Sequence, residues 1–215
     1  MMKKIVLFDW GSVLCRYKTG PVDFWMELLR DVNANVYGYE FQSKFEDFKR
    51  NPEMSFENAI TDDLFDEYII KVLNYFGAEP SRKNISNFKI SFVKQCVLQY
   101  ETNTELLEYA YSLMDRVEVG LLSNVVPLEL PIQDITVQRS KFGYRFLSCE
   151  VGHSKPGKDI YEMVESVLGS EYEIMFIDDK IINLNVPKQL GWRVHHYKAG
   201  NEACIKDIEA FLQEE

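Results

Sequence analysis

Short apolar runs that alternate with helical patterns constrain the fold of this chain more than any other feature. Five runs have the length and composition of buried strands, at residues 3–8, 117–122, 144–150, 172–177 and 192–197. Helical patterns separate the later runs, at residues 104–115, 156–168, 182–191 and 201–213. A helix between consecutive strands favours a parallel sheet with helices on both faces. The predicted fold class is therefore α/β, with a Rossmann-like, doubly wound parallel sheet as its core.

The segment between the first apolar run and the others has a different character. Residues 19–99 show helical periodicity and no convincing strand, and Thr61 followed by acidic residues suits the start of a helix. We expect residues 19–99 to form an all-helical insertion in a core made of residues 1–18 and 100–215. Two stretches of the core are expected to be irregular, 12–18 as a turn or flap and 127–141 with at most weak helix.

The composition is that of a globular protein and argues against several kinds of partner. The chain has 215 residues, of which 46% are hydrophobic and 27% charged, enough for one core and a smaller insertion. Acidic residues outnumber Lys and Arg by 34 to 24 with no basic stripe, which argues against nucleic acid. No apolar run approaches the ~20 residues of a membrane span or the length of a secretory signal. We therefore expect a cytoplasmic monomer or homodimer, away from membranes, with free thiols.

Polar residues follow the apolar runs where the strands would end. Because the carboxyl ends of parallel strands meet at one edge of a sheet, we expect these residues to share one crevice. They are Asp9, Ser123, Asn124, Lys155, Asp178 and Asp179. Three adjacent carboxylates repel one another unless a cation lies between them, and hard oxygen ligands favour Mg²⁺. With the charge of Lys155 added, the set suits a phosphoryl group, and a carboxylate nucleophile would give an aspartyl-phosphate.

Four segments, in this order and spacing, resemble the four motifs of the haloacid dehalogenase superfamily. They are FDWGSVL, LLSN, SKPGKDIY and FIDD, which begin at Phe8, Leu121, Ser154 and Phe176. The resemblance covers the whole chain, and the helical insertion resembles the C1 cap of subfamily I. It implies a Mg²⁺-dependent hydrolase, and four motifs in order are specific to the superfamily without specifying a substrate.

The resemblance implies a role for each matching residue. The implied catalytic residues are Asp9 as nucleophile, Ser123 as the hydroxyl that binds the phosphoryl group and Lys155 as the bridge between nucleophile and phosphate. The implied Mg²⁺ ligands are Asp9, the backbone carbonyl of Gly11, Asp178 and Asp179. We expect substrate contacts from Gly11, from Asn124 beside the serine, and from Trp10, which directly follows the nucleophile.

The first motif departs from the superfamily's pattern at Gly11. Most phosphatases of the superfamily have a second aspartate there, which protonates the leaving group and then activates water. Gly11 keeps the backbone carbonyl but lacks that proton relay, and such acid–base help is typically worth about 10²–10⁴-fold in rate. Some members that resemble sugar-phosphate phosphatases read FDLG here, so glycine does not by itself indicate an inactive enzyme. We expect slow turnover and a preference for good leaving groups.

Several neighbouring residues have simpler interpretations. Asn183, in the DDxxxN continuation of the last motif, is expected to cap a helix. His153 is a weak candidate for a replacement acid, because it lies close to Lys155 in sequence. His195 and His196 are expected to be structural or solvated, and Cys15 is expected to be a small apolar filler.

Three functions are compatible with these residues. The leading one is a Mg²⁺-dependent phosphatase acting on a small phosphorylated metabolite, for example a sugar phosphate. The second is a metal-free haloacid dehalogenase, which also uses an aspartate nucleophile; the paired acids Asp178 and Asp179 argue against it. The third is a catalytically impaired protein that binds a phosphorylated ligand, which the loss of the proton relay would explain.

Overall fold

The computed structural model describes residues 2–34, 39–54, 56, 59–198 and 200–214. Contacts divide the chain into two compact units. The first comprises Met1–Arg16, Glu101–Val125 and Gln133–Glu215, and the second comprises Tyr17–Tyr100 with Val126–Ile132. The second unit therefore includes a short segment from the later part of the chain, which the sequence pattern did not indicate.

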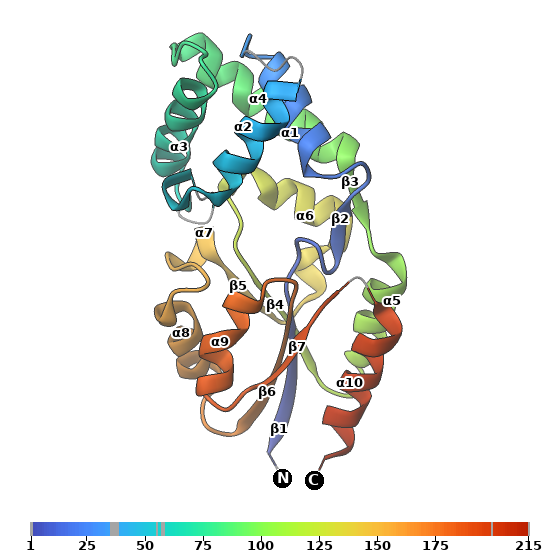
Figure 1. Cartoon of the computed structure of the whole chain (residues 1–215). Helices are drawn as coiled ribbons and strands as arrows, with labels where there is room; N and C mark the ends of the chain where they lie inside the picture. Colours follow the sequence, from blue (N-terminus) through green and yellow to red (C-terminus); the bar gives the residue numbers. More distant parts are fainter. Residues whose placement is uncertain (1, 35–38, 55, 57–58, 199, 215) are drawn as a thin grey trace. The chain divides into compact units, whose positions relative to one another are not determined.

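A five-stranded sheet forms the centre of the first unit (Figure 1). Its strands are β1 (Lys3–Phe8), β4 (Glu118–Ser123), β5 (Tyr144–Leu147), β6 (Tyr172–Asp178) and β7 (Arg193–His196). They pair in the order β5-β4-β1-β6-β7, and every pair is parallel. This arrangement confirms the predicted α/β fold with a Rossmann-like parallel sheet.

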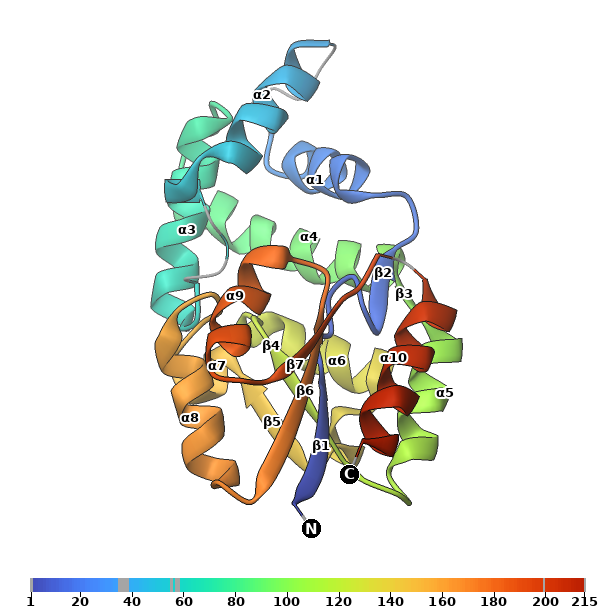
Figure 2. The same cartoon turned by 60° about the horizontal axis from the view of Figure 1, so that its bottom comes forward.

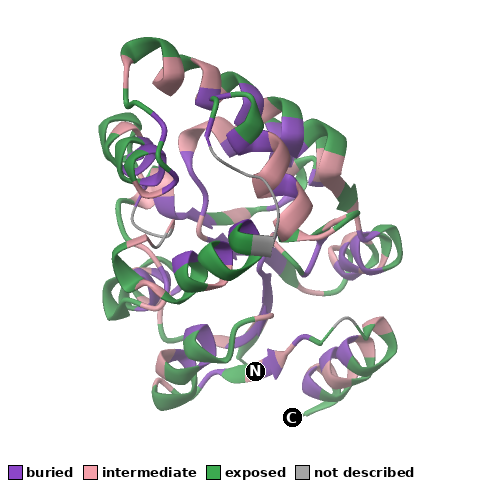
Figure 3. Ribbon diagram, turned by 45° about the horizontal axis from the view of Figure 1, so that its top comes forward, coloured by how far each residue is buried: buried purple, intermediate pink, exposed green. Residues whose placement is uncertain are grey.

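Helices cover both faces of this sheet, as the views in Figures 1 and 2 show. On one side lie α5 (Thr104–Leu113) and α10 (Asn201–Gln213), joined by a hydrogen bond of 2.8 Å from the Tyr109 hydroxyl to Glu209. On the other side lie α8 (Lys158–Leu168) and α9 (Ile181–Gln189). The central strands between them are mostly buried, whereas the helices alternate buried and exposed residues (Figure 3).

The side chains of β1 show why the central strand is apolar on both faces. Ile5 and Leu7 pack in a buried cluster with Ile160 and Tyr161 of α8 and with Phe176 of β6. The other residues of the strand's apolar run are also fully buried. Burial on both faces is typical of a central parallel strand and fixes where β1 must end.

Two predictions for the core were wrong in detail. The predicted strand over 144–150 ends at Leu147, and the helical turn α7 (Ser148–Val151) follows it. In this turn the buried Ser148 hydroxyl is hydrogen-bonded to the backbone N–H and carbonyl of Val125. Residues 12–18 are not wholly irregular, since β2 (Cys15–Tyr17) pairs with β3 (Tyr100–Thr102) in a two-stranded sheet.

The segment 127–141 is more helical than predicted. Residues 127–141 contain η3 (Pro127–Glu129), α6 (Leu130–Val137) and η4 (Arg139–Lys141), which are short helical pieces. The four cysteines are free. No helix within the described residues is long and apolar enough to cross a membrane.

The second unit is helical throughout its described residues between 19 and 99. It contains α1 (Pro21–Arg30), α2 (Tyr39–Arg50), η1 (Pro52–Met54), α3 (Asp62–Tyr75) and α4 (Arg82–Gln99). Thr61 caps α3 as expected, because its side chain accepts a hydrogen bond of 3.2 Å from the backbone N–H of Leu64. Aromatic rings such as Phe24, Phe92 and Phe65 stack or meet edge to face in its interior.

Candidate active site

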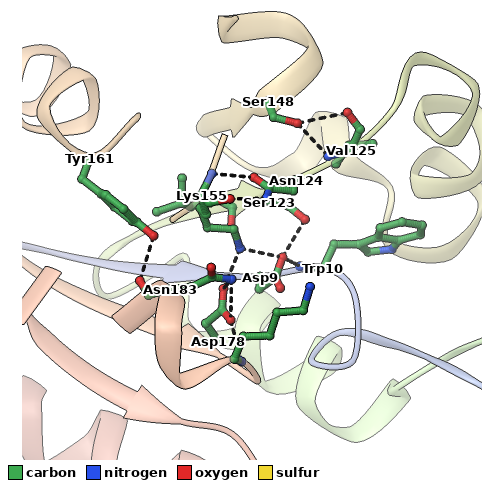
Figure 4. A network of polar contacts seen from close by, with 12 residues as sticks. Asp9, Trp10, Ser123, Asn124, Val125, Ser148, Lys155, Tyr161, Asp178 and Asn183 are labelled. Atoms are coloured by element: carbon green, nitrogen blue, oxygen red, sulfur yellow. Dashed lines mark hydrogen bonds and ion pairs between the residues drawn. The ribbon is translucent and has the colours of Figure 1, made fainter. Parts of the chain in front are cut away.

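The strand ends bring the predicted polar residues together in the first unit (Figure 4). Asp9 directly follows β1, Ser123 ends β4 and Asp178 ends β6. Lys155 comes from the loop between α7 and α8, and its side chain extends towards Asp9 and Asp178. Ligand oxygens of Asp9, Asp178 and Asp179 all lie within 4.8 Å of one another. The structure thus places together the residues that the strand-end rule predicted to meet.

Lys155 is a buried cation within this cluster. Its Nζ lies 2.6 Å from Asp178 Oδ2 and 3.1 Å from Asp9 Oδ1, and it donates to the carbonyl of Leu122 at 3.0 Å. The side chain is 1% exposed. Burial alone would lower the pKa of Lys155, but the two carboxylates raise it above its usual value. The ammonium group is therefore charged and uses all three of its protons in this site.

Asp9 is held through one of its two oxygens. Oδ1 accepts hydrogen bonds from the Ser123 hydroxyl at 2.6 Å and from the Trp10 backbone N–H at 2.8 Å, and it also faces Lys155. Among the described residues no donor reaches Oδ2, so this oxygen keeps free acceptor capacity. Burial, together with repulsion from Asp178 and Asp179, raises the pKa of Asp9 to about 7, against the opposing effects of Lys155 and Ser123.

Asp178 is saturated by protein donors. Its Oδ2 accepts hydrogen bonds from the Lys155 ammonium and, at 3.1 Å, from the Asn183 side-chain amide. Its Oδ1 accepts from the same amide at 3.0 Å and from the Lys180 backbone N–H at 2.8 Å. The carboxylate is fully buried. The Tyr161 hydroxyl in turn donates to the backbone carbonyl of Asn183 at 2.8 Å. Asn183 therefore does not cap α9, as the sequence had suggested; it holds Asp178, and Lys180 stands at the cap position.

Asp179 is the less enclosed of the paired acids. Burial and the neighbouring Asp178 raise the pKa of Asp179, while the charges of Lys180 and Lys155 and, to a smaller extent, the Ser12 side chain act in the opposite direction. Ser12 adopts a left-handed backbone conformation, with φ of 62°, which is unusual for a residue other than glycine. This carboxylate is therefore better placed than Asp178 to accept a cation.

Asn124, the last residue of LLSN, is hydrogen-bonded to the backbone of Lys155 in SKPGKDIY. Its Nδ2 donates to the Lys155 carbonyl at 2.7 Å, and its Oδ1 accepts from the Lys155 backbone N–H at 2.8 Å. The next residue, Val125, exchanges two hydrogen bonds with the Ser148 hydroxyl, at 2.9 and 3.1 Å. The role of Ser148 was missed, because a lone serine in an apolar run carries no sequence signal for a contact 23 residues away.

Gly11 and Trp10 occupy the turn after Asp9. A Cβ atom built at Gly11 would meet nothing within 4 Å, so the position has room for a larger residue. The Trp10 side chain is 3% exposed, and its indole N–H donates to the Thr136 hydroxyl at 3.0 Å. Figure 4 shows the Trp10 ring directed away from the carboxylate cluster. Its predicted contact with substrate stays a prediction.

The three histidines differ in burial and in what they contact. His153 lies on the surface, with Nδ1 3.7 Å from Asp159, and His195 bonds Asp207 of α10 at 2.7 Å. His196, in contrast, bonds the backbone carbonyl of Asp179 at 3.0 Å. The position of His196 next to the site was not foreseen, because the pairing of β7 with β6 that places it there is a tertiary feature.

Comparisons with solved structures agree with this fold. No model of a known protein family matches the chain, and no curated protein matches it. Among solved structures, a predicted HAD-like family hydrolase from Porphyromonas gingivalis superposes with a TM-score of 0.71 at 21% identity, covering 100% of both chains. A HAD family enzyme from Bacteroides thetaiotaomicron, in complex with magnesium and inorganic phosphate, superposes with a TM-score of 0.62 at 19% identity, covering 93% of this chain and 96% of that one.

A third similar structure is a putative beta-phosphoglucomutase from Thermotoga maritima, with a TM-score of 0.64, 16% identity and coverage of 96% and 91%. At these identities the likeness shows the fold. The chain has the fold of HAD-like hydrolases, where HAD stands for haloacid dehalogenase. The site chemistry must be argued from its own residues.

The residues present fit a Mg²⁺ ion. Three carboxylates lie together and two ammonium groups act on them, since Lys155 contacts Asp9 and Asp178 and the charge of Lys180 also acts on Asp179. One negative charge stays uncompensated when all three acids are ionised. The oxygen donors are those that Mg²⁺ prefers, and one or two carboxylates suffice to hold it with substrate phosphate and water. Asp9 and Asp179 are the carboxylates with free acceptor capacity, whereas Asp178 is occupied by protein donors.

Proposed function

We propose that this chain is a Mg²⁺-dependent phosphatase of the haloacid dehalogenase superfamily, hydrolysing a small phosphorylated metabolite such as a sugar phosphate through an aspartyl-phosphate on Asp9. The observation that carries the proposal is the state of Asp9. Its Oδ1 is fixed by Ser123, Lys155 and its own neighbour's N–H, while Oδ2 has no donor among the described residues. This is how a carboxylate nucleophile is oriented for attack.

The residues around Asp9 would bind and orient the phosphoryl group. Ser123 and Lys155 present a hydroxyl and an ammonium at the same oxygen, so both lie within reach of a phosphate that approaches Oδ2. Attack by Oδ2 on phosphorus breaks the bond to the leaving-group oxygen, and water later breaks the new acyl-phosphate bond. Both steps gain from fixed positive charge, because phosphoryl transfer depends mainly on positioning and charge neutralisation.

We assign Asp9, Asp179 and the carbonyl of Gly11 to direct contact with Mg²⁺, and Asp178 to its support through Lys155 and Asn183. When bound, Mg²⁺ neutralises phosphate charge and keeps the carboxylates ionised. That second effect matters here because the pKa of Asp9 stands at about 7 without a cation. The negative charge of Asp178 in turn favours the charged form of Lys155.

Gly11 sets the expected substrate preference. No carboxylate stands at this position to protonate the leaving group, so the departing oxygen must take its proton from water. Esters with good leaving groups, such as anomeric sugar phosphates or aryl phosphates, are therefore the expected substrates. We further propose that residues 19–99 act as the cap that selects the substrate, in a cytoplasmic monomer or homodimer.

The test is hydrolysis of p-nitrophenyl phosphate by the full chain with Mg²⁺ and with EDTA. We expect metal-dependent release of phosphate, and loss of at least about 10³-fold in kcat for Asp9→Asn, which has nearly the same shape but no nucleophilic carboxylate. Equal rates for the wild type and this variant would exclude the proposal.

A second candidate function follows from the missing carboxylate at Gly11. A chain without a proton relay could bind a phosphorylated ligand and not turn it over. Tight binding of phosphate esters with no turnover across a broad panel of phosphorylated metabolites would favour this sensor. Release of halide from 2-chloropropionate without added metal would instead favour a haloacid dehalogenase.

A further inference from the structure

His196 is the last residue of β7 and lies opposite Asp178 in the pairing of β7 with β6. Its Nε2 lies 3.0 Å from the backbone carbonyl oxygen of Asp179. A carbonyl oxygen can only accept a hydrogen bond, so the ring nitrogen must carry the proton and donate it. The direction of this bond is therefore fixed.

The neighbouring backbone strengthens the attachment. The N–H of Tyr197 donates to the carbonyl of Asp178 at 3.0 Å. Two successive carbonyls, those of Asp178 and Asp179, are thus held by two successive residues at the end of β7. The Asp178 carbonyl is held by a backbone group that any residue but proline would supply, whereas the Asp179 carbonyl depends on the His196 side chain.

The two acids also differ in how their side chains are fixed. The Asp178 carboxylate receives donors on both oxygens from Lys155, Lys180 and Asn183. Among the described residues no comparable set of donors holds the Asp179 carboxylate, on which the charges of Lys180 and Lys155 and the exposed Ser12 act. The orientation of Asp179 therefore depends more on its backbone than that of Asp178 does.

We propose that His196 is a positioning residue for the metal site: its hydrogen bond to the Asp179 carbonyl fixes the peptide from which the Asp179 carboxylate extends towards the cation. This inference rests on the proposed function, since it assumes that Asp179 binds Mg²⁺. His196 touches neither the metal nor the substrate. Its effect is to keep a ligand pre-organised, a role for which outer partners of metal ligands typically account for about 10–100-fold in affinity.

Two amide substitutions of His196 separate the hydrogen bond from general effects on the strand. In His196→Gln the side-chain N–H falls close to the position of the histidine Nε2, so the donor is kept. In His196→Asn the amide is one methylene shorter and ends short of the carbonyl. His195→Asn is the matched control, because His195 bonds Asp207 instead and the same change there leaves Asp179 untouched.

The measurement is isothermal titration of Mg²⁺ alone into the full chain, with the thermal midpoint of each variant determined beside it. We expect about tenfold weaker Mg²⁺ binding for His196→Asn, and wild-type affinity within about twofold for His196→Gln. We expect wild-type affinity for His195→Asn even if its thermal midpoint falls. A merely structural role would lower thermal midpoints without this pattern in affinity.

The outcomes distinguish the two claims. If the wild type binds Mg²⁺ and His196→Asn binds it equally well, the inference about His196 is wrong and the proposed function stands. Tenfold weaker binding by a folded His196→Gln also overturns the inference, and this comparison remains decisive if His196→Asn does not fold. If the wild type itself binds no Mg²⁺, the proposed function is wrong, and the inference about His196 is wrong as well.

Discussion

Asp9 must satisfy two opposing requirements at the scale of a single residue. In the proposed mechanism it has to be ionised to attack phosphorus, yet it is buried beside two other carboxylates. Ser123 and Lys155 support the ionised form, and their hydrogen bonds explain why the site is built around one oxygen of this residue. The balance between these effects makes Asp9 sensitive to both pH and metal.

A first prediction concerns stability without metal. The pKa of Asp9 is about 7 in the folded protein, against 3.8 as its ordinary value. Between these values the folded state binds more protons than the unfolded state, so the free energy of unfolding falls as the pH rises. In EDTA, the thermal midpoint should decrease from about pH 5 to about pH 8, and Asp9→Asn should reduce that decrease. The same slope in both proteins would contradict this account of Asp9.

Gly11 leads to a second prediction at this scale. Because nothing lies within 4 Å of the added Cβ, Gly11→Asp should fold normally. An acid at this position would protonate poor leaving groups, so kcat for phenyl phosphate should rise at least about tenfold, with little change for p-nitrophenyl phosphate. Gly11→Asn, which has the same size and no acid, is the control. A similar gain from the asparagine would show that shape, not proton transfer, limits turnover.

At the scale of elements, the loops that follow the strands are tied to one another by side chains. Asn124 binds the backbone of Lys155 in both directions, and Ser148 does the same for Val125. The loop after β4 is thereby fixed to the segments on either side of α7. This explains how a lysine from an irregular loop reaches two carboxylates at well-defined distances.

A third prediction tests this connection. Ser148→Ala would leave the buried N–H of Val125 without its partner, at a cost of about 1–3 kcal/mol in the free energy of unfolding. Ser112→Ala is a suitable control, since its hydroxyl is exposed and bonds only a nearby carbonyl; its effect should stay within about 0.5 kcal/mol. Urea denaturation measures both. Equal small losses in the two variants would show that the Ser148 contacts do not stabilise the loop.

The elements also show which features a sequence reveals. The strands β1, β4 and β6 can be predicted from their apolar runs because burial on both faces leaves a clear pattern, and β7 is predicted correctly although it is only partly buried. The end of β5 was predicted wrongly, because an apolar run alone does not tell a strand from a helical turn.

At the scale of the whole molecule, the parallel order of the strands brings the residues of the site together. The rule that strand ends meet at one edge correctly predicted the meeting of Asp9, Ser123, Lys155 and Asp178. The supporting bonds of Asn183 and His196 could not be predicted. They depend on how α9 and β7 lie against β6, and no local pattern encodes that register.

A fourth prediction concerns the stability of the whole chain with ligands. A cation and phosphate that bind only the folded state raise its stability by mass action, by about 2.7 kcal/mol at a hundredfold excess over the dissociation constant. MgCl₂ with inorganic phosphate should therefore raise the thermal midpoint of the wild type, and raise that of Asp179→Asn much less. An equal rise in the variant would remove Asp179 from the proposed metal site.

The most direct test of the central claim is to trap the intermediate on Asp9. Acid quenching during steady-state hydrolysis of p-nitrophenyl phosphate with Mg²⁺, followed by peptide mass spectrometry, should find one added phosphoryl group on the peptide that contains Asp9. The modification should be absent in EDTA and in Asp9→Asn. Sustained hydrolysis with the phosphoryl group on another residue, or undiminished hydrolysis by Asp9→Asn, would contradict the account.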